Sequence, residues 1–158
     1  MNSIDQVDIS GKRVLMRVDF NVPVDAGGNV TDTTRIKAHL RTIRYCMEKG
    51  AKLVLISHMG RPKGQRVDKL TLKPCAAILS GLLGKEVPFV DDCVGEKAQK
   101  AVDAMKPGDV ILLENLRFHI GDEKNDPDFA RQLAGLADVY IDDALDRKST
   151  RLNSSHRT

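Results

Sequence analysis

The feature that most constrains the fold is a regular alternation, from Lys12 onward, of short aliphatic runs and longer segments with a helical period. The short runs have the length and composition of buried strands, and the segments between them are long enough for helices. Alternating strands and helices form a parallel sheet, because each helix returns the chain to the same end of the sheet. The runs are RVLMRV (13–18), LVLIS (53–57), VPFV (87–90), VILLE (110–114) and DVYID (138–142).

The clearest helical pattern spans residues 33–50, TTRIKAHLRTIRYCMEKG. Its apolar residues Ile36, Leu40, Ile43 and Met47 fall on one face, and Gly50 is placed to end the helix. The segments 70–84, 94–105 and 126–137 supply the remaining helices. The predicted fold class is therefore α/β, a three-layer Rossmann-like parallel sheet with helices on both faces. Such sheets bind ligands at the carboxyl ends of their strands.

Composition favours an ordinary globular domain and argues against several functions. The chain has 158 residues, 41% of them hydrophobic, and carries a net charge of +3. The basic excess lies in residues 146–158, which hold four Lys/Arg and one Asp, so the rest of the chain is neutral. With no Trp, two Tyr and four Phe, the chain lacks the basic and aromatic surface of a nucleic-acid-binding protein. It also has no apolar run long enough for a membrane span and no secretory signal, so we expect no membrane partner and a cytoplasmic location.

The three cysteines, Cys46, Cys75 and Cys93, are odd in number and widely spaced. None belongs to a CxxC motif or to a sequence cluster with histidine. We therefore expect buried, reduced thiols and neither a disulfide framework nor a zinc site.

The last thirteen residues, DRKSTRLNSSHRT (146–158), differ from the rest of the chain. They contain one strong apolar residue, Leu152, and no periodicity, which is typical of a disordered tail. The string also resembles the in-frame translation of a short-read sequencing adapter. We expect the genuine coding sequence to stop near Leu145 and the tail to be non-native.

Polar residues follow three of the predicted strands. Because parallel strands end at the same edge, these side chains are expected to meet. The first strand leads into RVDFNVP with Asp19 and Asn21, the second into SHMGRPKG with His58 and Arg61, and another into LLENLRFH with Glu114, Asn115 and Arg117.

A further cation reaches the same edge from a helix. Asp32, Thr33 or Thr34 can cap the helix that follows, which places Arg35 in its first turn. A cation is disfavoured there by the helix dipole, unless an anion binds beside it. Three arginines and a histidine would hold a small polyanion, while Asp19 and Asn21 would hold hydroxyl groups. The predicted ligand is a small phosphorylated hydroxy acid.

Each residue also has a plainer interpretation. Asp19 could form a structural ion pair with Arg17 or Arg61, His58 could be an ordinary hydrogen-bonded histidine, and Arg35 could be a solvated surface charge, as could Arg117. The run GDEKND (121–126) is interpreted as a solvated turn. The expected convergence at one edge favours the binding site. No nucleotide phosphate loop and no catalytic nucleophile motif is present.

The motifs RVDFNVP, TRI, SHMGRPKG and LLENLRFH, in this order, resemble the amino-terminal domain of phosphoglycerate kinases over residues 7–145. The resemblance implies a glycolytic, monomeric enzyme that moves a phosphoryl group reversibly between 1,3-bisphosphoglycerate and ADP, giving 3-phosphoglycerate and ATP. It implies that residues 1–145 are an incomplete phosphoglycerate-binding domain. Mg-ATP or Mg-ADP would bind to a carboxyl-terminal domain outside this chain, which itself holds no cofactor or metal.

The resemblance also implies roles for individual residues. Asp19 and Asn21 would hold the hydroxyl and carboxyl end of the substrate, and Arg35 would be the catalytic residue beside the transferring phosphoryl group. The distal phosphate would bind His58, Arg61 and Arg117, and the substrate-binding set also includes Phe20, Met59 and Gly60. After DVYIDDAL the family continues to a further arginine, a hinge and the nucleotide domain, so we expect this chain alone to be inactive. The alternative is a stand-alone module that binds small anions without catalysis.

Overall fold

The computed structural model describes residues 8–144 and the pair 152–153. A six-stranded sheet with the order β3-β4-β2-β1-β5-β6 lies at its centre. The first five strands run parallel to their neighbours, as predicted from the alternating pattern. Their bounds are β1 Arg13–Arg17, β2 Lys52–Ile56, β3 Phe89–Val90, β4 Val110–Leu113 and β5 Val139–Asp142.

The sixth strand comes from the segment that was expected to be a disordered, non-native tail. β6, Leu152–Asn153, pairs antiparallel with Ile141 and Tyr140 of β5. The remainder of 146–158 lies outside the described residues.

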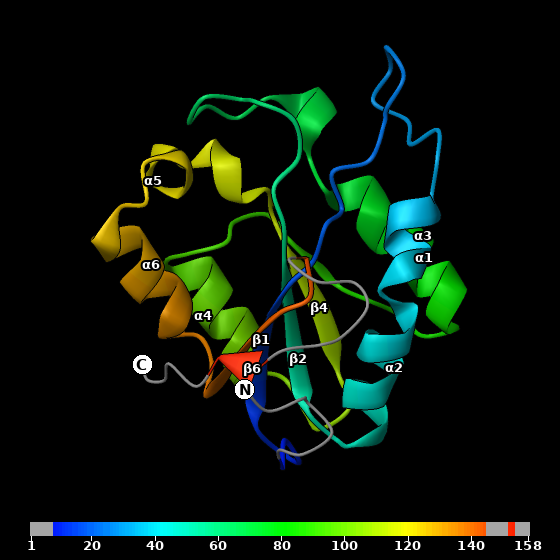
Figure 1. Cartoon of the computed structure of the whole chain (residues 1–158), viewed down its shortest axis with the longest axis vertical. Coiled ribbons are helices and arrows are strands. Elements are labelled where there is room, and N and C mark those ends of the chain that lie inside the picture. The colour runs from blue at the N-terminus through cyan, green and yellow to red at the C-terminus, as the bar shows by residue number, and fades with distance from the viewer. Residues whose placement is uncertain (1–7, 145–151, 154–158) are drawn as a thin grey trace.

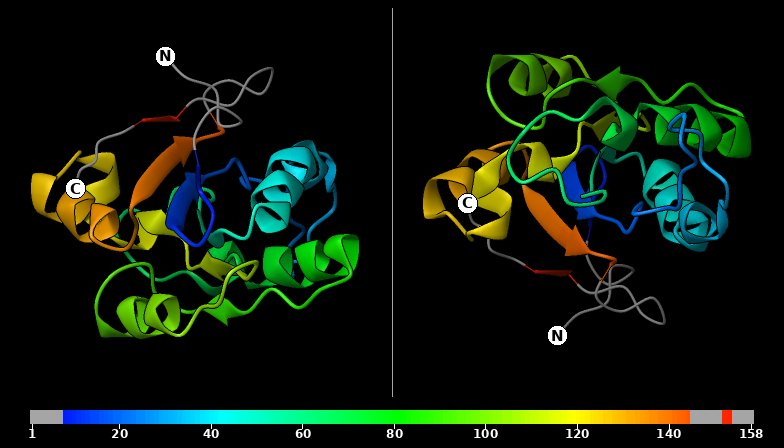
Figure 2. Two further views of the ribbon diagram at one scale, coloured as in Figure 1. Left: turned by 90° about the horizontal axis from the view of Figure 1, so that it is seen from below. Right: turned by 90° about the horizontal axis from the view of Figure 1, so that it is seen from above.

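Helices cover both faces of the sheet, which gives the predicted three layers (Figures 1 and 2). Three helices pack on one face and two on the other, while a short helix and two 3₁₀ turns lie in the loops. The first face carries α1 Thr34–Ala38, α2 Leu40–Glu48 and α3 Lys73–Leu83; the second carries α4 Glu96–Asp103 and α6 Pro127–Ala134; the loops hold η2 Asp68–Leu70, η3 Leu116–Phe118 and α5 Ile120–Glu123.

The middle residues of the central strands β1 and β2 are apolar because both faces of these strands are buried. In β2, Leu53 and Leu55 belong to the core under α1–α3, whereas Val54 and Ile56 belong to the core under α4 and α6. All four side chains are at most 2% exposed. Packing on both faces therefore fixes the position of β2, and with it the position of the loop that follows its carboxyl end.

The predicted helix over 33–50 is in fact two helices joined at His39. The His39 N–H donates to the carbonyl of Ile36, three residues back, where an uninterrupted α-helix would bond four residues back. The helix ends as predicted at Gly50, which adopts a left-handed φ of 78°. No helix among the described residues is both long and apolar enough to cross a membrane.

Candidate anion-binding site

The loop that follows β1 is fixed by hydrogen bonds that its main-chain N–H groups donate. The Phe20 N–H donates to Ser57 Oγ at 3.0 Å, and the Asp19 N–H donates to His39 Nε2 at 3.0 Å. The Phe20 side chain is completely buried, and its N–H and carbonyl already bond to Ser57 Oγ and to the Val22 N–H, so this predicted substrate-binding residue shapes the loop. Asn21 directs its N–H to Asp19 Oδ1 at 3.2 Å, which keeps the two predicted side chains together.

A buried histidine–aspartate pair supports that loop, and sequence reasoning missed it. His39 Nδ1 lies 2.7 Å from Asp143 Oδ2, and the two side chains are 1% and 6% exposed. Because His39 Nε2 accepts the Asp19 N–H, the ring proton lies on Nδ1 and is donated to the carboxylate. Asp143 in turn is anchored through its N–H to the Arg17 carbonyl. The pair thus connects the ends of β1 and β5 to the main chain of Asp19.

Arg35 reaches the β1 loop from the first turn of α1, as predicted. Its Nη1 donates to the Asn21 carbonyl at 2.5 Å and lies 3.4 Å from Asp19 Oδ1. Asp32 fixes the start of this helix, since its Oδ1 accepts from both the N–H and the hydroxyl of Thr34. The Arg35 side chain is 44% exposed, so its guanidinium remains open to a ligand.

The loop that follows β2 is shaped by Asn115 from the end of β4. Asn115 Oδ1 accepts the Met59 N–H at 3.1 Å, and Asn115 Nδ2 donates to the Met59 carbonyl at 2.8 Å. Met59 is buried, and its N–H and carbonyl both already bond to Asn115, so this predicted substrate-binding residue shapes the loop. The next residue, Gly60, donates its N–H to Asn21 Oδ1 at 3.0 Å, which joins the two loops directly.

Gly60 is required at this position. Its φ of 63° is left-handed, and a Cβ there would lie 2.7 Å from a methyl carbon of Leu70. Arg61, which follows, is exposed and makes no hydrogen bond or ion pair with another described residue. It is the freest of the predicted cations.

Arg117 is placed by the third loop and has an unexpected partner. Its Nε lies 3.2 Å from Asp122 Oδ2, and Arg17 Nη1 lies 3.4 Å from Asp122 Oδ1. Asp122 is only 8% exposed. The interpretation of 121–126 as a solvated turn is therefore wrong for this residue, because α5 turns it inward between two arginines. Arg17, considered at first only as a structural partner of Asp19, belongs to the same cluster.

The pKa of His58 is affected by its burial and by the charges of this cluster. Burial, together with the Arg117 and Arg17 charges, lowers the pKa of His58 below its ordinary value of 6.5, although Asp122 and Asp19 oppose the shift. The imidazole is therefore neutral near pH 7. A bound anion would raise the pKa of His58, because it would favour the imidazolium.

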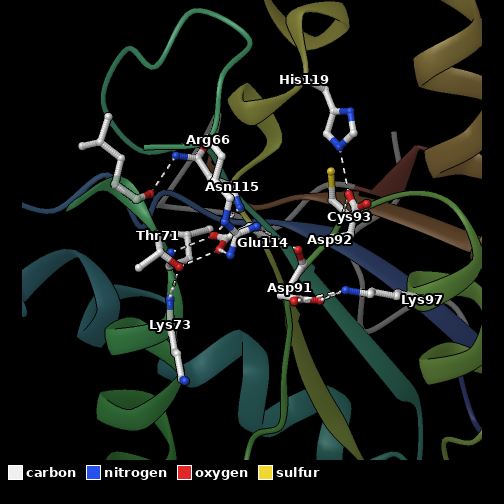
Figure 3. A network of polar contacts seen from close by, with 12 residues as sticks. Arg66, Thr71, Lys73, Asp91, Asp92, Cys93, Lys97, Glu114, Asn115 and His119 are labelled. Atoms are coloured by element: carbon white, nitrogen blue, oxygen red, sulfur yellow. Dashed lines mark hydrogen bonds and ion pairs between the residues drawn. The ribbon is translucent and has the colours of Figure 1, made fainter. Parts of the chain in front are cut away.

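Glu114 and Asn115 follow β4, and Figure 3 shows Glu114 within a polar network that includes Thr71. Glu114 is 1% exposed, and its carboxylate accepts the Leu72 and Asn115 N–H groups and the Thr71 hydroxyl. Asn115 is fully buried and also accepts the Arg117 N–H. These two residues stabilise the loops at this edge of the sheet. Anion binding is assigned to the arginines around them.

At this edge of the sheet, cationic side chains can bind an anion, and nearby oxygen atoms can accept hydrogen bonds from hydroxyl groups. Arg17, Arg117 and His58 form one group around Asp122, while Arg35 with Asp19 and Asn21 forms a second. Such an arrangement binds and orients a small polyanion and can stabilise transferred negative charge. It needs no nucleophile of its own for that purpose.

Comparison with known proteins gives a consistent result. The family model for phosphoglycerate kinase matches residues 4–156. Among curated relatives, the phosphoglycerate kinase of Picosynechococcus sp. is 58% identical over 143 residues and that of Moorella thermoacetica is 56% identical over 143 residues. Each alignment covers 90% of this chain and 36% of the relative, so the chain spans about a third of their length.

Solved structures agree with the sequence comparison. The structure of phosphoglycerate kinase from Pyrococcus horikoshii has a TM-score of 0.82 and 33% identity, covering 91% of this chain and 36% of that one. The structure from Coxiella burnetii has a TM-score of 0.80 and 35% identity, covering 90% and 35% of the two chains.

Proposed function

Since the chain belongs to the phosphoglycerate kinase family, we propose that its strand-end cluster binds 3-phosphoglycerate or 1,3-bisphosphoglycerate. The observation that carries the proposal is the convergence of Arg35 with Asp19 and Asn21 at the edge where Arg17, Arg117 and His58 gather. Phosphoglycerates carry negative charge at each end and a hydroxyl between. That pattern matches two cationic groups separated by hydrogen-bonding oxygens.

The proposed roles follow from these positions. Asn21 and Asp19 bind the hydroxyl and carboxyl end, and Arg35 stabilises the phosphoryl group during transfer. The distal phosphate lies against Arg117 and His58, with Arg61 free to close over it. Arginine suits these positions because its planar fork donates two parallel hydrogen bonds to a phosphate or carboxylate.

The reaction that we propose for the whole enzyme is reversible transfer of a phosphoryl group between 1,3-bisphosphoglycerate and ADP. Phosphoryl transfer depends mainly on positioning and charge stabilisation, and arginines at this edge supply both on the acceptor side. Mg-nucleotide would be held by the part of the relatives that this chain does not span. We therefore expect binding by this chain without turnover. We also infer a cytoplasmic, monomeric enzyme from the resemblance to the phosphoglycerate kinase family.

Titration calorimetry with 3-phosphoglycerate tests the binding claim, and glycerate, which lacks the phosphate, is the matched ligand control. Arg117→Gln removes one charged donor from the phosphate, so we expect roughly a tenfold or greater loss of affinity. Arg131→Gln is the control variant, because Arg131 is 73% exposed on α6 and pairs only with its neighbour Asp128. Equal binding by wild type and Arg117→Gln would refute the assigned role. Absence of heat from folded wild-type protein would refute binding altogether.

A further inference from the structure

Three potential metal ligands meet at the ends of β3 and β4, beside the anion-binding site but separate from it. Asp92 and Cys93 follow β3, and His119 follows η3. His119 Nε2 lies 2.8 Å from Asp92 Oδ1, and the Asp92 oxygen, Cys93 Sγ and the His119 ring nitrogen all lie within 4.8 Å of one another. Figure 3 shows the Cys93 sulfur and the Asp92 carboxylate both directed toward the His119 ring.

We propose that Asp92, Cys93 and His119 form a binding site for Zn²⁺ or a similar thiophilic divalent cation. Sulfur and imidazole nitrogen are ligands that zinc accepts readily, whereas Mg²⁺ and Ca²⁺ require oxygen. Tetrahedral zinc bonds of about 2.0–2.3 Å place ligand atoms roughly 3.5 Å apart. Small side-chain rotations would therefore close the present spacing around a cation. The fourth position would be taken by water.

Two of the three ligands are accessible from solvent, and the third, Cys93, is buried directly beneath them. Asp92 and His119 are 39% and 36% exposed, so a cation can enter from solvent. Asp92 is oriented by the main chain, since its Oδ1 accepts the Cys93 N–H at 2.7 Å. No hydrogen bond within the described part of the chain uses Asp92 Oδ2. That oxygen is available to a metal, while ligation by His119 Nε2 would replace its present hydrogen bond to Asp92 Oδ1.

Local electrostatics favour a cation at this point. Burial and the nearby carboxylates of Asp92, Asp122 and Glu114 raise the pKa of the Cys93 thiol, because each disfavours a second negative charge. The same carboxylates attract a divalent cation, and coordination offsets the cost of forming the thiolate. On binding, the Cys93 thiol releases its proton to solvent. To ligate through Nε2, the imidazole must carry its proton on Nδ1, so the hydrogen bond that Nε2 donates to Asp92 Oδ1 is exchanged for the bond to the metal.

Sequence reasoning predicted no zinc site, because the cysteines show no clustering with histidine. Asp92 and His119 are 27 residues apart, and only the adjacent positions of β3 and β4 bring them together. Because His119 lies two residues beyond Arg117, a bound cation would tie the end of β3 to the loop that carries that arginine. The inference is independent of the proposed phosphoglycerate binding.

The test is a titration of the untagged full chain with Co²⁺, which reports thiolate ligation by a strong charge-transfer absorbance. We expect one Co²⁺ per chain, displacement by Zn²⁺ and no displacement by an excess of Mg²⁺. Cys93→Ala and His119→Gln should abolish the absorbance or reduce it at least tenfold. Cys75→Ala is the matched control, because Cys75 is an equally buried thiol on α3, in the core on the other face of the sheet from Cys93.

Thermal denaturation provides a second test, which does not depend on whether Cys93→Ala folds. Zn²⁺ should raise the Tm of wild type and of Cys75→Ala but not that of His119→Gln, whose side chain is partly exposed and whose fold should persist. Absence of a thiolate band in folded wild-type protein would overturn the proposal. So would an unchanged band in either Cys93→Ala or His119→Gln.

Discussion

Replacing His39 with leucine should destabilise the protein through two hydrogen bonds that the buried ring makes. The ring accepts the Asp19 N–H at 3.0 Å and donates to the Asp143 carboxylate at 2.7 Å. A neutral bond contributes about 0.5–1.5 kcal/mol and a bond to a charged group about 1.5–3 kcal/mol. Leucine keeps much of the volume but neither bond, so His39→Leu should lower the free energy of unfolding by about 2–4 kcal/mol. That is a large part of the 5–15 kcal/mol typical of a domain.

Urea denaturation measures this change, and His39→Gln separates hydrogen bonding from packing. With a slope of roughly 1–3 kcal/mol per molar urea, the midpoint for His39→Leu should fall by about 1–2 M without a change of slope. Glutamine retains one donor and one acceptor, so His39→Gln should recover part of the loss. A His39→Leu midpoint equal to wild type would refute the reasoning. Equal losses in both variants would assign the effect to ring packing, such as the edge contact with Phe20.

Three further predictions concern the loops and the core. Gly60→Ala should lower stability by about 1–2 kcal/mol from the left-handed φ alone and weaken phosphoglycerate binding, as calorimetry and urea denaturation would show. Asp122→Asn should lower the pKa of His58 further in an NMR titration, because Asp122 now opposes the shift. In wild type, protonation of His58 should cost stability as the pH falls below 6.5. Burial raises the pKa of Cys46 and Cys75 to about 12, so neither thiol should react with a disulfide reagent until denaturant is added. An unchanged His58 titration, or rapid labelling of both thiols in the native protein, would contradict these accounts.

Local patterns were sufficient to predict the sheet and the edge at which the cluster lies. Apolar runs located β1, β2, β4 and β5 within a residue or two, because strands buried on both faces leave little freedom in composition. The position of Arg35 followed from helix-capping residues, which act over a few residues of sequence. Both predictions depend only on residues close together in the sequence, and such local patterns can be recognised without knowledge of the fold.

Residues whose partners are distant in sequence could not be predicted in the same way. The GDEKND run resembles a solvated turn, yet α5 directs Asp122 between Arg17 and Arg117. His39 lies in a helical pattern, and its partner Asp143 is 104 positions away. Phe20 and Met59 belong to the predicted motifs, but the fold turns their side chains into the core. Only packing of the loops against one another decides these contacts.

The most direct test of the account is an NMR titration of the isotopically labelled chain with 3-phosphoglycerate. The amide signals of Asp19, Asn21, Gly60 and Arg117 should shift together with one dissociation constant, and the pKa of His58 should rise on saturation. Signals of Gly11, Gly50 and Gly108, at the opposite edge of the sheet where β1, β2 and β4 begin, should stay in place. Shifts confined to that edge, or none at saturating ligand, would contradict the proposal that the strand-end edge binds phosphoglycerate.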